Sequence, residues 1–149
     1  MQILEHQSIY MNNLISYKLH MTREKTPSMI RHILKNIGIL NMQPSGKIMF
    51  TEDDGQYQNM EILIPVDHEF EPCEQYGRKN TFKLINAVSV RHEGDFSETK
   101  KTEQKLLDFV KEKSYQMITK PYYSIVRLDD EHIGNCIIDI YIGVNYNIL

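Results

Sequence analysis

Alternation of apolar and polar residues predicts strands along most of the chain. Between residues 14 and 21, every second side chain is apolar and the intervening ones are largely polar, which is the period of a half-buried strand. Apolar runs of strand length predict further strands at 47–51, 60–66, 83–90, 122–128 and 136–144.

Helical spacing marks two other stretches. Isoleucines at 30, 33 and 37 form one buried stripe, Thr26 and Pro27 suit the N-cap and first helical position, and Gly38 suits a left-handed end. A second apolar stripe predicts a helix from about Ser97, as its N-cap, to Met117. Strand, helix, strand, strand therefore occurs twice.

The two copies align by counting. An offset of about 73 residues brings Lys18 onto Arg91, and an offset of about 78 brings Glu61 onto Asp139. We expect one α+β domain over 1–149, built of two tandem pseudo-repeated strand-helix-strand-strand modules at about 8–66 and 83–144, with a linker at about 67–82. The sheet is expected to be mostly antiparallel, with the helices on one face and a cleft between the modules.

Composition narrows the function classes. Hydrophobic residues make up 41% of the 149 residues and charged residues 25%, which is typical of a globular protein. The net charge of −3 argues against a nucleic-acid partner. No run of 18 apolar residues and no basic leader is present, so we expect no membrane partner and a cytoplasmic location.

Candidate chemistry is sparse. The two cysteines and six dispersed histidines are not spaced as in a disulfide framework or a metal site. Cys136 is predicted to be a small buried apolar residue. No phosphate loop, nucleophile elbow or cofactor motif is present, so we expect no cofactor, and the sequence favours a protein that is not an enzyme. His92 and Glu93 suit acid–base work, or simply a turn at the strand end.

Two short motifs resemble a known family. Arg-His-Glu-Gly-Asp-Phe at 91–96 follows a strand and precedes a helix, and Ile64-Pro65-Val66 ends the first module. They resemble the strand-end motif and the aliphatic-Pro-Val end of the GyrI-like small-molecule-binding domains, which are the effector-binding domains of multidrug-responsive bacterial transcription activators. The chain departs from that pattern in having Asp95-Phe96 where Pro-Tyr is common, and in having no tryptophan. The resemblance implies a bacterial ligand-binding domain. The two modules account for most of the chain and leave no helix-turn-helix segment. The resemblance therefore also implies a stand-alone member without a DNA-binding domain.

Carboxylates and tyrosines are the candidate ligand contacts. Glu61 and Asp139 fall at matching positions and point away from the helix-covered face, where a carboxylate can attract a cation. Tyr141 shares a face with Asp139, and an aromatic ring beside an acid suits a cationic ligand. The predicted ligand-binding residues are Glu61, Asp139, Tyr141, Tyr17 and Tyr123. Solvated strand acids and ordinary packed tyrosines are the alternative.

The predicted function is binding of a small amphipathic or cationic molecule. Two alternatives stay open: a small-molecule hydrolase that uses a pocket Glu and Tyr, since hydrolases occur in the resembled superfamily, and an interaction module that inhibits a protein partner. The sequence leaves the ligand and the oligomeric state open.

Overall fold

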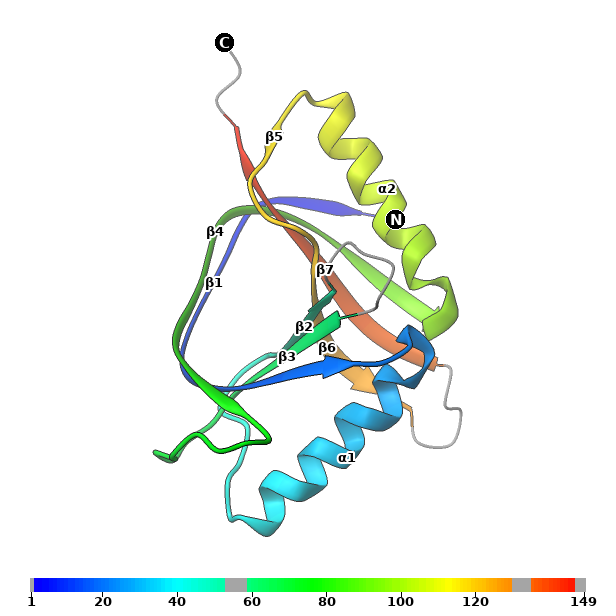
Figure 1. Cartoon of the computed structure of the whole chain (residues 1–149). Coiled ribbons are helices and arrows are strands. Elements are labelled where there is room, and N and C mark those ends of the chain that lie inside the picture. Colours follow the sequence, from blue (N-terminus) through cyan, green and yellow to red (C-terminus); the bar gives the residue numbers. More distant parts are fainter. Residues whose placement is uncertain (1, 53–58, 130–134, 147–149) are drawn as a thin grey trace. The chain divides into compact units, whose positions relative to one another are not determined.

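The computed structural model describes residues 2–52, 59–129 and 135–146. Within them the chain forms seven strands, two α-helices and two short 3₁₀-helices (Figure 1). The strands and α-helices are β1 (Ile3–His20), α1 (Thr26–Ile39), β2 (Ile48–Glu52), β3 (Asn59–Pro65), β4 (Gly77–Asp95), α2 (Thr99–Glu112), β5 (Gln116–Met117), β6 (Tyr122–Leu128) and β7 (Asn135–Asn145). The strand pairs described below are antiparallel, and the predicted α+β class is confirmed.

The chain divides into two compact units. We call Met1–Tyr10 with Lys83–Leu149 the terminal unit, and Met11–Phe82 the central unit. Both boundaries fall inside strands, because β1 and β4 each continue from one unit into the other. The predicted single domain and the predicted cleft between modules stay predictions.

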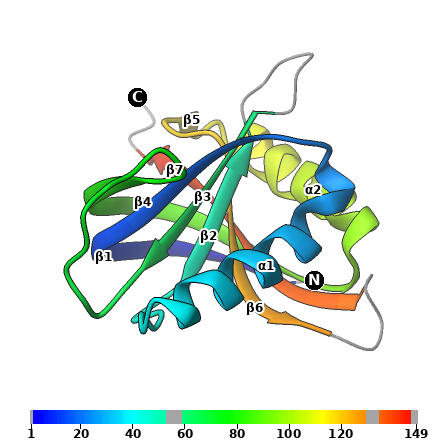
Figure 2. The same cartoon turned by 60° about the horizontal axis from the view of Figure 1, so that its bottom comes forward.

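In the central unit, β3 pairs with both β1 and β2. The β1–β3 register places Ile15 opposite Ile64 and Lys18 opposite Glu61. α1 lies across these strands in Figure 2, and its buried stripe of Ile30, Ile33 and Ile37 is the one that the sequence predicts. Apolar burial of that stripe is what stabilises the helix, since an isolated helix of 14 residues is marginal in water.

In the terminal unit, β7 is the common partner of β4, β5 and β6. The β4–β7 register runs from Ala87 opposite Gly143 to Asp95 opposite Asn135. α2 lies alongside β4 and β7 (Figure 1) and buries Leu106 and Val110.

The units repeat the same local structure. A 3₁₀-helix at Arg23–Lys25 leads into α1, and another at Phe96–Glu98 leads into α2, so both segments begin 73 residues apart (23 to 96 and 26 to 99). The strand registers agree with the sequence offsets as well, because Lys18 opposite Glu61 in one unit corresponds to Arg91 opposite Asp139 in the other. This agreement supports the predicted module repeat, which stays a prediction.

The first strand is longer than predicted. It begins at Ile3, eleven residues before the predicted start at 14 (14 − 3 = 11). His6 and Asn13 have positive φ angles of 58°, and each such residue interrupts the pleat. After Asn13, four consecutive residues from Leu14 to Tyr17 are buried, so simple alternation fails over this strand.

β4 also differs from prediction at both ends. Its first residues, 77–82, belong to the predicted linker, and its last, 91–95, to the predicted break after the strand. Pairing with β7 carries the strand through to Asp95, and Gly94 has a φ of 126°, which an L side chain rarely adopts. A partner strand thus extends a segment that local composition marks as a turn.

All four predicted helix ends are wrong in detail. Thr26 is the first residue of α1 and donates to Met60 Sδ instead of capping, and the left-handed residue after α1 is Asn41 rather than Gly38. Asp95, not Ser97, supplies the cap before α2, by accepting the Ser97 N–H at 2.8 Å. α2 ends at Glu112, so 116–117 is strand β5. The predicted turns at 52–55 and 129–132 lie mostly outside the described residues.

Candidate functional site

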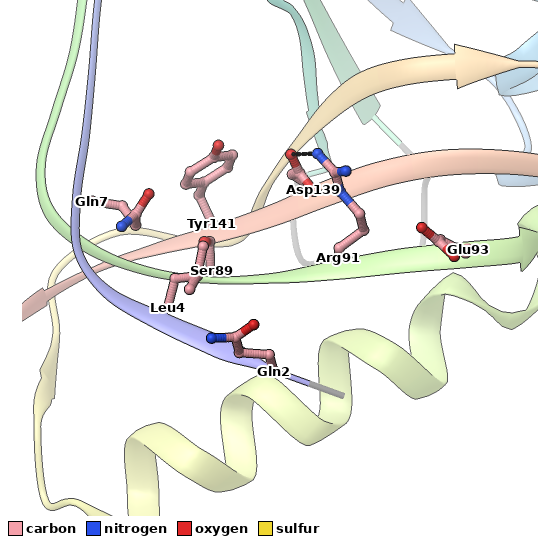
Figure 3. Close-up of a pocket in the computed structure, with 8 residues that line it drawn as sticks. All are labelled: Gln2, Leu4, Gln7, Ser89, Arg91, Glu93, Asp139 and Tyr141. Atoms are coloured by element: carbon pink, nitrogen blue, oxygen red, sulfur yellow. Dashed lines mark hydrogen bonds and ion pairs between the residues drawn. The ribbon is translucent and has the colours of Figure 1, made fainter.

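The helix-free face of the terminal unit carries a pocket of about 710 Å³, which we call the strand-face pocket. Five of its described lining residues come from two strands (Figure 3): Ser89, Arg91 and Glu93 from β4, and Asp139 and Tyr141 from β7. Leu4 and Gln7 come from β1, and Gln2 directly precedes it. α2 packs against the opposite face of β4, because His92, the residue after Arg91 in this strand, hydrogen-bonds to Thr102 of α2.

Arg91 and Asp139 face each other across the two strands and form a bidentate ion pair. Arg91 Nε donates to Asp139 Oδ1 at 2.8 Å, and Nη2 donates to Oδ2 at 3.1 Å. The hydrogen bond to Asp139 is the main reason that the pKa of Arg91 is raised above its ordinary value. The Asp139 side chain is 15% exposed and the Arg91 side chain 53%. A fork of this kind fixes the carboxylate while its cationic partner stays open to solvent.

Tyr141 lies two residues after Asp139 on the same face and is buried. Burial, followed by the charge of Asp139, raises the pKa of the Tyr141 phenol, although the Arg91 charge opposes this shift. The phenol is therefore neutral at physiological pH and able to donate a hydrogen bond. Its ring presents an apolar surface beside an acid.

Ser124 on β6 lies opposite Asp139 in the sheet. Its hydroxyl oxygen is buried and has no hydrogen-bond partner among the described residues. Directly opposed residues of an antiparallel pair point to the same face, so this hydroxyl is a spare polar group next to the ion pair.

The structure brings together two of the five predicted ligand contacts, Asp139 and Tyr141. Glu61, at the matching position of the central unit, accepts a hydrogen bond from Ser16 Oγ at 2.7 Å. Tyr17, one strand position away from Ser16, lies on the opposite, helix-covered face of β1. Which of them contact a ligand stays a prediction.

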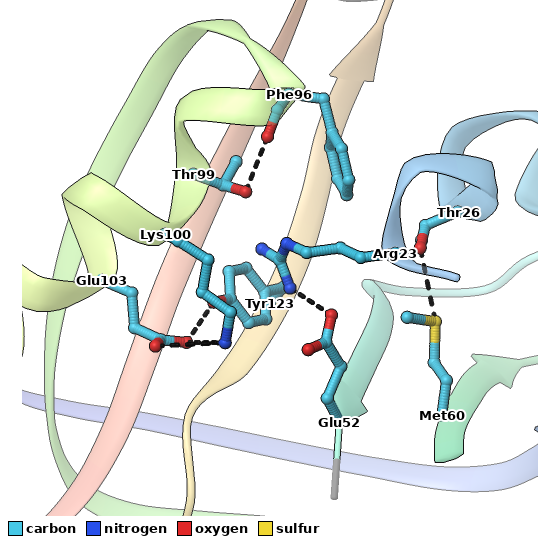
Figure 4. Close-up of polar contacts among 9 residues, drawn as sticks. All are labelled: Arg23, Thr26, Glu52, Met60, Phe96, Thr99, Lys100, Glu103 and Tyr123. Carbon is cyan, nitrogen blue, oxygen red and sulfur yellow. Dashed lines mark hydrogen bonds and ion pairs between the residues drawn. The ribbon is translucent and has the colours of Figure 1, made fainter. Parts of the chain in front are cut away.

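Tyr123 lies in the core of the terminal unit. It is 1% exposed, and its hydroxyl donates to Glu103 of α2, to which Lys100 also donates (Figure 4). Tyr123 pairs with Ile140, which places it on the helix-covered face, whereas Asp139 is on the other. Figure 4 also shows, in the central unit, Arg23 donating to Glu52 and Thr26 donating to Met60.

His92 is part of the core, not of the pocket. Its Nε2 lies 2.8 Å from the Asp95 carbonyl oxygen, and its Nδ1 lies 2.7 Å from Thr102 Oγ1 of α2. A carbonyl can only accept, so Nε2 donates, and the neutral ring accepts the Thr102 proton at Nδ1. His92 thereby ties β4 to α2. That His92 and Glu93 act as acid and base stays a prediction.

Arg91 is one of the pocket-lining residues that sequence reasoning did not select. Its signal was present in the repeat, since Arg91 aligns with Lys18, and Asp139 aligns with Glu61. Cross-strand pairing of a cation with the predicted carboxylate follows once the register is known. The described residues contain no group of three or more His, Cys, Asp or Glu side chains that could hold a metal ion. Among all the residues that the structure describes, no helix has the length and apolar character needed to cross a membrane.

Solved structures share this fold, although no protein-family model and no curated protein matches the chain. The crystal structure of the EcmrR C-terminal domain has a TM-score of 0.76 at 12% identity and covers 97% of this chain and 97% of that chain. The cryo-EM structure of an EcmrR–DNA complex has a TM-score of 0.78 at 13% identity and covers 96% of this chain. A crystal structure described as a hydrolase from Listeria innocua has a TM-score of 0.56 at 10% identity and covers 97% of this chain and 90% of that chain.

These likenesses establish the fold. The chain spans 57% of the EcmrR chain in the DNA complex. The match to the EcmrR C-terminal domain over nearly the whole of both chains supports the fold that the sequence resemblance implies.

Proposed function

We propose that this protein binds a small amphipathic cation in the strand-face pocket of the terminal unit. The observation that carries the proposal is the joint placement of Asp139 and Tyr141 in one pocket. Its volume of about 710 Å³ lies within the range of about 300–1,000 Å³ that is usual for small-molecule sites.

Charge favours a cationic ligand. The charged side chains among the described lining residues are Asp139, Glu93 and Arg91, so two negative charges oppose one positive charge. Arg91 neutralises Asp139, and Glu93 is exposed and free to attract a cation to the opening. The apolar part of the ligand then lies on Leu4 and the Tyr141 ring, whose face also attracts positive charge.

The fold likeness supports a ligand-binding role. The chain shares its fold with the EcmrR C-terminal domain, and its motifs at 91–96 and 64–66 resemble those of GyrI-like ligand-binding domains. The predicted contacts Glu61, Tyr17 and Tyr123 are left out of this site, because the first two belong to the central unit and the third is in the core.

A thermal-shift titration with tetraphenylphosphonium tests the proposal. We expect a concentration-dependent rise in the unfolding midpoint, since a ligand that binds the native state stabilises it by mass action. Asp139→Asn is expected to weaken binding by about tenfold or more, the usual effect of losing one charge-assisted contact. Glu61→Gln, the matched carboxylate of the central unit, is the control and should bind as the parent does. Equal loss in both variants, or no shift with the parent, would contradict the proposal.

A small-molecule hydrolase is the second candidate, favoured by the fold shared with a protein described as a hydrolase. In this reading Asp139 or Glu93 acts as the base and Tyr141 donates to the substrate oxygen. Release of p-nitrophenol from p-nitrophenyl acetate, lost in both Asp139→Asn and Tyr141→Phe, would favour it. Tetraphenylphosphonium binding without turnover of the ester favours the binding function.

A further inference from the structure

The central unit contains a second pocket, on the face of its strands that α1 covers. This helix-face pocket has a volume of about 600 Å³ and lies between β1, α1 and the segment that precedes β4. Its described lining residues are Tyr17, Leu19, Met29, His32, Ile33, Asn36, Leu40, Cys73, Gln75 and Tyr76. It shares no residue with the strand-face pocket.

The two pockets differ in the charge of the side chains that line them. None of the described residues that line the helix-face pocket is Asp, Glu, Lys or Arg. Burial is the main reason that the pKa values of the Tyr17 and Tyr76 phenols are raised, so both rings stay neutral well above physiological pH. An ion would enter this pocket without a counter-charge and would lose its hydration, which is unfavourable. The pocket therefore selects against ions.

Aromatic surface lines one wall. The ring centroids of Tyr17 and Tyr76 lie 5.6 Å apart at 52°, and Tyr76 packs edge-on against Phe70 at 5.8 Å. Met29 of α1 and Leu40, which directly follows α1, add apolar surface. Planar aromatic ligands suit such walls, because offset and tilted ring contacts add to the free energy of apolar burial.

One polar group in this wall is available to a ligand. Tyr17 is 9% exposed, and its hydroxyl has no hydrogen-bond partner among the described residues. Two pairs of polar lining side chains already bond to each other, Asn36 to His32 and the Cys73 thiol to Gln75 Oε1. The Tyr17 phenol is a hydrogen-bond donor in the pocket wall, and a ligand acceptor could bind it.

We infer that the helix-face pocket is a second binding site, for an uncharged planar aromatic molecule that carries a hydrogen-bond acceptor for Tyr17. This goes beyond the proposed function, because it concerns another pocket, another unit and another ligand chemistry.

Nile red, an uncharged planar dye with a carbonyl acceptor, tests the inference with the full chain. We expect saturable binding with a rise in fluorescence. Tyr17→Phe keeps the ring and removes the hydroxyl, so its affinity should fall by about fivefold, as expected for one hydrogen bond. Leu40→Lys puts a charge at the exposed rim and should weaken binding by about tenfold, whereas Ile118→Lys, an equally exposed apolar residue of the terminal unit, should have no effect.

Cys73 gives an independent readout, because it is exposed and lines the pocket while Cys136 is buried. Saturating Nile red should slow bimane labelling of Cys73, and Cys73→Ser reports the background. An unchanged labelling rate, or equal weakening by Leu40→Lys and Ile118→Lys, would overturn the inference. Asp139→Asn should bind Nile red as the parent does, so failure here and failure of the proposed cation site can be told apart.

Discussion

The terminal and central units repeat one order of elements but place their larger described pockets on opposite faces. In the terminal unit the pocket lies on the helix-free face and contains an ion pair. In the central unit it lies on the helix-covered face, and none of its described lining residues is Asp, Glu, Lys or Arg. A similar order of elements thus leaves the position and chemistry of a pocket undecided.

Matched positions explain the difference on the helix-covered faces. His92 in the terminal unit fills the space between β4 and α2 and hydrogen-bonds to Thr102, whereas the aligned residue Leu19 lines the pocket of the central unit (19 + 73 = 92). Glu103 of α2 bonds to Tyr123, whereas the aligned Ile30 of α1 makes apolar contacts (30 + 73 = 103). Polar side chains therefore bridge the helix and strands in the terminal unit, whereas mostly apolar side chains line a pocket at the equivalent interface of the central unit.

The largest expected effect tests whether the two helix stripes are equivalent. Ile33→Ala in α1 and the aligned Leu106→Ala in α2 each remove a buried side chain, so each should lower the free energy of unfolding by about 3 kcal/mol. Urea unfolding measures the change, and Lys35→Ala, exposed on α1, should change it by less than about 0.5 kcal/mol. A clearly smaller loss for Ile33→Ala would show that the pocket lets the central unit relax.

A reciprocal exchange tests the polar bridge. His92→Leu leaves the Thr102 hydroxyl and the Asp95 carbonyl without their partner and should cost about 2 kcal/mol of unfolding free energy. Leu19→His places a polar ring at the wall of an existing pocket, where it can reach solvent, and should cost less than about 1 kcal/mol. Equal costs in denaturant unfolding would contradict the explanation given for the two interfaces.

The ion pair should matter little for stability. Arg91 is half exposed, and pairs of this kind contribute about 0–1 kcal/mol, so Asp139→Asn should lower the unfolding free energy by less than about 1 kcal/mol. In 1 M salt, ionic screening should make the difference in unfolding free energy between the parent and the variant smaller still. Urea unfolding at low and high salt measures this change. A loss of several kcal/mol would mean that Asp139 is a structural residue, and the weaker ligand binding of its variant would then need another explanation.

The smallest effect is spectroscopic and belongs to the terminal unit. Tyr115 donates to Glu5, and this hydrogen bond is the main cause that raises the pKa of Tyr115 to about 12. Because the folded pKa lies above the ordinary value of 10.0, the bond stabilises the fold fully below pH 10, and its contribution disappears as the pH rises through about 12. The ultraviolet difference between the parent and Tyr115→Phe should show this phenolate transition. A midpoint near 10 would contradict it.

Sequence reasoning succeeded where one short-range pattern decided the outcome. The stripe of α1 and strand β6 follow from local periodicity, because a helix or strand must bury its apolar side whatever it packs against. The pairing of Asp139 with Tyr141 on one face needed only the two-residue period of a strand. The repeat offset also anticipated which carboxylates occupy equivalent strand positions.

Tertiary structure decided the rest. Partner strands extended β4 through Arg91 and His92, and positive φ angles at His6 and Asn13 reset the alternation of β1, neither of which local composition encodes. Neighbouring strands and helices determine which polar side chains form hydrogen bonds. Arg91 donates to Asp139 and Ser16 donates to Glu61, whereas the Tyr17 hydroxyl is available to a ligand. Local periodicity was enough to predict both α-helices, the central parts of six strands and the faces that they bury, but not β5 or several element ends. Pocket positions and polar partners required the fold, because they depend on residues that are distant along the chain.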